Sequence, residues 1–411
     1  MLEWWPWLLL LALGFFGAGW LFARIDIKHL LSESRALPQS YFRGLNFLLN
    51  EQPDQAIESF LEVTRQNPEA VELQFGLASL FRRRGEVDRA IRVHQALSER
   101  ADLPAEQRTM ALLELALDYQ KAGLLDHAER ILNDVVSRGA GTDAQRAQAL
   151  ALLLEIYVAE NDWGKAISAA ERMQDAGGRG LAREIAHFHC EHAVAAHARG
   201  ESAAADAALD AALAANPACV RANLLRGQWL AEAGRHDEAI DALLAIATQD
   251  PAYLGLAAAP LLASFQARGR QQEGMERLRE MQRQAPSLDV LQVLCNATLQ
   301  SEGAAAAYRL VKDDLRINPT LVGLDRLLEA EVAAAPAGTR ADLQMQRDIV
   351  HSHSSRLAVY LCAHCGFKAK QFHWHCPACG GWETFPPRQT AEGDDAERHL
   401  ARLQAEGAKA A

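Results

Sequence analysis

The sequence predicts an all-α superhelical solenoid, preceded by one transmembrane helix and followed by a small metal-binding ribbon. Three observations lead to this prediction. An uncharged apolar segment opens the chain, pairs of amphipathic helices recur through its middle, and two Cys-x-x-Cys pairs stand near its end. The composition agrees, because 49% of the 411 residues are hydrophobic and only 7% are aromatic. Richness in alanine and leucine is typical of helical proteins.

The first predicted element is a transmembrane helix over residues 1–24. The segment from Trp4 to Ala23 carries no charge, and about 20 apolar residues suffice to cross a bilayer core. Only Glu3 is charged before it, whereas a cleavable signal peptide begins with basic residues, so we expect the helix to remain attached. Basic residues after the segment predict a cytoplasmic C-terminal flank: Arg24, Lys28 and Arg35.

A juxtamembrane linker, residues 25–36, leads to a repeat array over residues 37–355. Residues 41–68 read as two amphipathic helices joined at a polar turn. A small residue recurs in the second helix of each unit, at intervals of 33 to 39 residues, where paired helices must cross closely: Ala56, Ala90, Ala128, Ala166, Ala205, Ala239, Gly274 and Ala307. This period indicates about eight to nine tetratricopeptide repeats.

Turns and terminators divide these units. A glycine turn precedes most second helices, and a proline, which cannot continue a helix, follows several of them. The fifth unit, which ends with residues 192–217, lacks bulky side chains, so we expect a loosely packed joint. Residues 321–355 continue as a helical ninth, divergent or capping unit.

The ribbon is predicted over residues 356–388, where the two Cys-x-x-Cys pairs are each followed by glycine. Four thiolates at this spacing indicate one tetrahedral metal site: Cys362, Cys365, Cys376 and Cys379. Two disulfides are the alternative, but cytoplasmic thiols stay reduced. The pattern is similar to the site of rubredoxins, although the connection between the pairs is shorter. Thiolates bind both iron and zinc, and a closed four-sulfur shell suits a structural or electron-transfer role.

Charge and missing motifs exclude several functions. A net charge of -11 disfavours a nucleic-acid partner. The chain has no phosphate-binding glycine loop, no HExxH and no G-x-S-x-G elbow, so we expect no enzyme activity. Helical solenoids generally bind proteins on their concave surface, and protein binding is therefore the expected activity.

A few other residues have two interpretations. The run Arg82-Arg83-Arg84 either contacts an acidic partner or forms a solvated face. The cluster of residues 187–192, HFHCEH, either forms a second metal site or consists of ordinary core and surface side chains. We interpret three histidines as neighbours of the metal site: His364, His373 and His375. We interpret the remaining cysteines as buried apolar residues: Cys190, Cys219 and Cys295. Residues 389–411 form a polar tail.

The order of anchor, repeats and ribbon, with the stretch Trp374-His375-Cys376-Pro377, resembles the lipopolysaccharide assembly protein B (LapB) family over residues 1 to about 388. The resemblance implies a bacterial inner-membrane adaptor with a periplasmic N-terminus, which presents the deacetylase LpxC to the protease FtsH and so restrains lipopolysaccharide synthesis. It also implies a ribbon packed on the repeats, and contact between the anchor and an inner-membrane lipopolysaccharide sensor.

The metal ligands of the family carry over to the four cysteines of the two pairs. Oligomers are possible. Gly14 and Ala18 either allow another membrane helix to approach closely or are small residues without a partner. Two other functions remain open: a scaffold for a different envelope complex, and a membrane-tethered, rubredoxin-like electron carrier.

Overall fold

The computed structural model describes residues 39–50, 52–66, 70–139, 141–175, 180–354 and 360–385. The predicted anchor, linker and tail lie outside these residues. Among the helices that are described, none has the length and apolar character needed to cross a membrane. The chain divides into two compact units, Met1–Glu160 and Asn161–Ala411.

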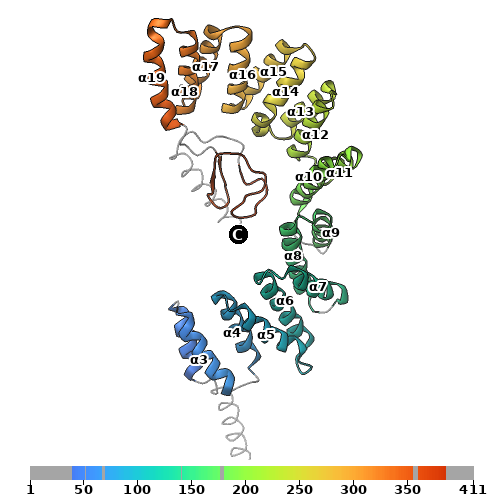
Figure 1. Cartoon of the computed structure of the whole chain (residues 1–411). Coiled ribbons are helices and arrows are strands. Elements are labelled where there is room, and N and C mark those ends of the chain that lie inside the picture. The colour runs from blue at the N-terminus through green and yellow to red at the C-terminus, as the bar shows by residue number, and fades with distance from the viewer. Residues whose placement is uncertain are drawn as a thin grey trace, which may run out of the picture. The chain divides into compact units, whose positions relative to one another are not determined.

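The first unit consists of helices that pair in chain order (Figure 1). They are α2 (Gln39–Leu49), α3 (Pro53–Gln66), α4 (Val71–Arg84), α5 (Val87–Glu99), α6 (Ala105–Lys121), α7 (Leu125–Arg138) and α8 (Asp143–Glu160).

The second unit continues the helical pattern and ends in the ribbon. Its helices are α9 (Trp163–Asp175), α10 (Ala182–Ala198), α11 (Ser202–Ala215), α12 (Val220–Glu232), α13 (His236–Gln249), η1 (Pro251–Tyr253), α14 (Leu254–Ala267), α15 (Gln271–Gln284), α16 (Leu288–Ser301), α17 (Ala304–Ile317), α18 (Leu321–Ala334) and α19 (Ala337–Ser354). The prediction that residues 321–355 are helical is confirmed for α18 and α19.

Small residues lie where paired helices cross, as the sequence predicts. All eight small residues of the second helices are buried. The first helices use the same device, because a Cβ atom on Gly44 would lie 2.6 Å from the Phe60 ring. Glycine also makes the turn between paired helices, since Gly85 and Gly234 have φ angles of +87° and +76°, which other residues adopt only with strain.

The fifth repeat, α10 and α11, corrects one expectation. Its alanine-rich faces do not form a loose joint. Ala186, Ala193, Ala208 and Ala212 belong to a continuous buried cluster with Cys190, Leu209, Cys219 and Ala222. Small side chains let the two helices approach closely instead of leaving gaps between them, so alanine fills this core by proximity.

The ribbon is a minimal β structure. Strands β1 (Tyr360–Leu361) and β2 (Lys368–Ala369) pair antiparallel, with Tyr360 opposite Ala369. Its core contains Tyr360, Cys362, Cys376 and Phe385. Such a small core does not fold by apolar burial alone, so the ribbon depends on a cross-link supplied by its cysteines.

Gly227 of α12 offers a test of the packing. Alanine raises helix propensity by about 1 kcal/mol, but a Cβ atom here would lie 2.5 Å from Cγ of the buried Leu243. We expect Gly227→Ala to lower the free energy of unfolding, because overpacking costs about 1–3 kcal/mol. Gly76→Ala is the control, since its Cβ would have no neighbour within 4 Å, and it should stabilise α4. Urea unfolding followed by circular dichroism measures both changes, and stabilisation by Gly227→Ala would contradict this packing.

Candidate metal centre and its docking surface

The four predicted cysteines come together in the ribbon. Their Sγ atoms all lie within 4.8 Å of one another, and two of the pairs, Cys362 with Cys379 and Cys365 with Cys376, are 3.8 Å apart. Metal–sulfur bonds of about 2.3 Å in a tetrahedron place sulfur atoms about 3.8 Å apart. The cluster therefore fits one four-coordinate metal ion. It is the only group of this kind among the residues that the structure describes.

Each cysteine pair lies on a tight turn of the backbone. Gly366 N donates to Cys362 O at 2.9 Å, and Gly380 N donates to Cys376 O at the same distance. Both glycines have positive φ angles, +76° and +68°, which explains why glycine follows each pair in the sequence. The two turns therefore have the same geometry and bring the two pairs of sulfur atoms face to face.

The surroundings of the thiols affect their ionisation in opposite directions. Burial disfavours the Cys362 thiolate, but the hydrogen bond with the Thr384 hydroxyl and those from the backbone N–H groups of Cys365 and His364 outweigh it and lower the pKa to about 6. Desolvation and the three neighbouring sulfur atoms raise the pKa of Cys379 to about 12, against a hydrogen bond from Gly381 N–H. A bound cation relieves this crowding of sulfur by replacing protons.

The ribbon docks on the repeats through Trp382, which is 8% exposed. The Trp382 ring stacks on His187 of α10 with a centroid distance of 4.9 Å. It also meets Phe188 and Trp163 edge to face, at 5.9 and 6.5 Å. Such ring pairs contribute about 0.5–1.5 kcal/mol each beyond area burial. This single side chain therefore anchors one end of the ribbon.

Glu383 adds a polar contact beside this ring. Its carboxylate lies 2.9 Å from His187 Nε2 and 3.3 Å from Arg183 Nε. His187 is fully buried and Glu383 is 17% exposed. Glu383 also has a φ angle of +51°, a strained value for a residue with a side chain. The docked position therefore holds Glu383 in a conformation that the isolated chain disfavours.

Trp374 forms the other half of the dock. Its ring stacks on Tyr253 at 5.4 Å with an interplanar angle of 4°. The Arg221 guanidinium lies 5.9 Å from the ring centroids of both Trp374 and Trp382. Burial raises the pKa of Asp289 at the start of α16, where a hydrogen bond to Tyr360 of the ribbon opposes the shift. The ribbon thus contacts α9, α10, α12, η1 and α16.

The other predicted candidates have structural roles. Arg82 does not face solvent freely, because it binds Glu114 and Asp118 at 2.7 and 2.8 Å. With Arg83, it lines a pocket of about 510 Å³. The HFHCEH cluster forms no metal site among the described residues. Cys190 and Cys219 are buried as expected, although their sulfur atoms lie only 3.8 Å apart. The three ribbon histidines are not part of the four-sulfur cluster.

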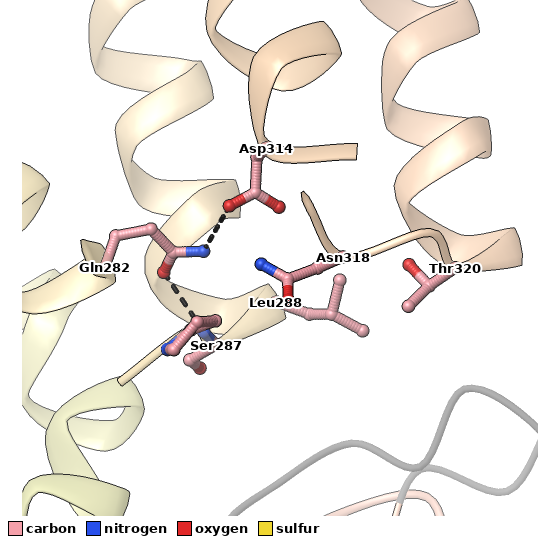
Figure 2. Close-up of a pocket in the computed structure, with 7 residues that line it drawn as sticks. Gln282, Ser287, Leu288, Asp314, Asn318 and Thr320 are labelled. Atoms are coloured by element: carbon pink, nitrogen blue, oxygen red, sulfur yellow. Dashed lines mark hydrogen bonds between the residues drawn. The ribbon is translucent and has the colours of Figure 1, made fainter. Parts of the chain in front are cut away.

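A second polar pocket, of about 190 Å³, lies where the α15–α16 and α17–α18 connections meet. Figure 2 shows Gln282 between Asp314 and Ser287. Its amide donates to Asp314 at 2.9 Å and accepts from Ser287 N at 3.1 Å. Ser287 and Thr320 in turn accept hydrogen bonds from the first turns of α16 and α18. These hydrogen bonds join successive repeats. None of them pairs a hydroxyl nucleophile with a base.

Sequence reasoning missed His187 and Glu383 as partners and Trp382 as an anchor. One signal was present, because the short ribbon contains Phe372, Trp374 and Trp382, more large rings than its own small core holds. A surplus of aromatic residues in so small a domain indicates a docking face.

The fold and the four-sulfur site define a tetratricopeptide repeat protein with a rubredoxin-type metal ribbon. Family models agree: a rubredoxin metal binding domain matches residues 360–387 and a tetratricopeptide repeat matches residues 43–102 and 190–253. Lipopolysaccharide assembly protein B of Escherichia coli (strain K12) is 33% identical over 377 residues, covering 91% of this chain and 96% of that protein. The chain belongs to the lipopolysaccharide assembly protein B family.

Two further proteins are similar to this chain at lower identity. The protein of the same name from Haemophilus influenzae is 29% identical over 386 residues, with 91% of this chain and 96% of that protein covered. A solved tetratricopeptide repeat protein from Parabacteroides merdae is 15% identical, with a TM-score of 0.26, and the match covers 76% of this chain and 100% of that one.

Replacing Cys376 tests the role of the cluster. We expect Cys376→Ser to abolish metal binding and to unfold the ribbon, because a structural metal supplies about 10–16 kcal/mol to such small domains. The helices should persist, since their own cores lie outside the ribbon. Metal analysis and far-ultraviolet circular dichroism measure the two effects. Cys295→Ala, at a buried cysteine of α16, is the matched control and should retain the metal. Loss of helical signal together with the metal would contradict this modularity.

The pKa values predict how metal affinity depends on pH. The Cys379 thiol, with a pKa of about 12, is protonated at neutral pH without metal, so binding must displace its proton. The apparent affinity for Zn²⁺ should rise by at least about tenfold per pH unit above pH 7. Below the Cys362 pKa of about 6 a further proton is displaced and the dependence steepens. Competition with a chromogenic chelator measures this slope, and a flat profile would contradict it.

Proposed function

We propose that this protein is a bacterial inner-membrane adaptor that presents the deacetylase LpxC to the protease FtsH and thereby limits lipopolysaccharide synthesis. The observation that carries the proposal is similarity along nearly the whole chain to proteins named lipopolysaccharide assembly protein B, at 33% identity over 91% of its length. The client and the protease come from the family resemblance described above, as does contact with a lipopolysaccharide sensor.

The parts of the molecule support an adaptor. Repeat arrays offer long surfaces for proteins. We assign residues 1–24 to a membrane anchor with a periplasmic N-terminus, residues 37–355 to the repeats and residues 356–388 to the ribbon. An anchored adaptor raises the effective concentration of a bound soluble client near a membrane protease. Proximity is then sufficient to speed degradation.

We further propose that the ribbon holds one metal ion, iron or zinc, through four ligands: Cys362, Cys365, Cys376 and Cys379. The surroundings of the cluster favour a structural role, because Thr384, which bonds to one sulfur, adjoins the docking residues Trp382 and Glu383. The ion then stabilises the surface that the ribbon presents to the repeats, and no electron transfer is required.

The half-life of LpxC after translation is stopped tests the function. Cells depleted of this protein should retain LpxC, and the wild-type chain should restore its rapid loss. A chain without residues 1–23 and the Cys376→Ser variant should both fail, whereas Cys295→Ala should succeed. An LpxC half-life that does not change on depletion would overturn the adaptor proposal and favour a scaffold for another envelope complex.

A further inference from the structure

The ribbon occupies the surface that a repeat array normally offers to a peptide. Its partners His187, Arg221 and Asp289 lie on α10, α12 and α16. Tyr253 lies in η1, at the entrance to α14. Helices α10, α12, α14 and α16 are the first helices of the fifth to eighth repeats. In a tetratricopeptide array, the first helices line the concave groove. The docked ribbon is therefore an internal ligand of this part of the groove.

The contacts define what this groove recognises. One partner is a flat ring, because His187 and Tyr253 each stack on a tryptophan. The other is a carboxylate, because Arg183 and His187 both contact Glu383. The neighbouring Glu191 is engaged elsewhere, since its carboxylate binds Arg221 at 2.9 Å. An aromatic side chain next to a carboxylate thus matches the groove in shape and charge.

The same ribbon segment is bonded to the metal centre. Thr384 Oγ1 lies 3.3 Å from Cys362 Sγ, and Thr384 O accepts from Ala363 N at 2.7 Å. Gly381 O accepts from Cys376 N at 2.8 Å. Residues 381–384 are therefore fastened to both cysteine pairs, and the two residues between these attachments are Trp382 and Glu383. Whatever orders the four sulfur atoms also orders the residues that fill the groove.

We propose that the ribbon closes this groove only while its four thiolates hold a metal ion, and that the opened groove binds a protein segment bearing an aromatic side chain beside a carboxylate. Without the cation, the small ribbon core loses its cross-link, and the strained Glu383 conformation relaxes. The proposal concerns the fifth to eighth repeats alone and does not depend on the identity of any client.

Hydroxyl-radical footprinting of the whole chain tests the closure. His187 and Tyr253, 0% and 8% exposed, should resist oxidation in the metal-loaded protein. They should become reactive after dialysis against a chelator in reducing buffer, and Zn²⁺ should restore protection. His94 and Tyr157, 0% and 5% exposed in the first unit, are internal controls that should stay protected. Continued protection of His187 without metal, or oxidation of His94 as well, would overturn the proposal.

Linkage provides a second measurement, because two coupled equilibria affect each other equally. His187→Ala, remote from the sulfur atoms in sequence, should weaken the equilibrium affinity for Zn²⁺, measured by competition with a chromogenic chelator, by about tenfold. The control is His197→Ala on the same helix, where the ring stacks on Trp229 at 4.2 Å and the affinity should be unchanged. Equal affinities in wild type and His187→Ala would contradict the coupling.

A peptide with the sequence of residues 380–385, GGWETF, tests the opened groove. Labelled with fluorescein, it should bind the metal-free chain at least about tenfold more tightly than the metal-loaded chain, because only the former leaves the site vacant. A matched peptide with alanine in place of tryptophan should bind neither the metal-free nor the metal-loaded chain. Equal binding of GGWETF to both forms, or to neither, would overturn the proposed specificity.

Discussion

Close approach of paired helices at small side chains is the constraint on which the rest of the structure depends. Bulky groups such as Phe60 and Leu243 pack directly over glycines of the first helices, and buried alanines take the same place in the second helices. Each repeat therefore buries its core against its neighbours, and its first helix keeps one face free of the core. In the fifth to eighth repeats that free face is where the ribbon binds.

The ribbon and the repeats depend on each other in different ways. The repeats have extended apolar cores of their own, of which the cluster around Leu243 and Phe265 is one. The ribbon has a core of a few side chains and two strands of two residues each. Its order therefore comes from cross-linking at one end, through four sulfur atoms, and from docking of Trp374 and Trp382 at the other.

An adaptor benefits from such an arrangement. A solenoid is extended and deforms by small changes at each joint, whereas a domain that contacts several repeats holds several joints at once. The ribbon contacts α9, α10, α12, η1 and α16, so it braces successive repeats of the second unit. The first unit has no such brace among its described residues, and one of its pockets is lined by Arg83 and Lys121 beside the ion pairs of Arg82.

The sequence alone determined the helical repeats, their turns and the four cysteines of the ribbon, because each of these depends on residues near one another in the chain. Period, glycine turns and Cys-x-x-Cys spacing are local patterns. Only the tertiary structure decided that Trp382 and Glu383 meet His187, that Arg82 is held by Glu114 and Asp118, and that alanine packs the fifth repeat tightly. Those outcomes depend on how far apart helices settle and which faces meet, and no local pattern specifies contacts between residues so distant in sequence.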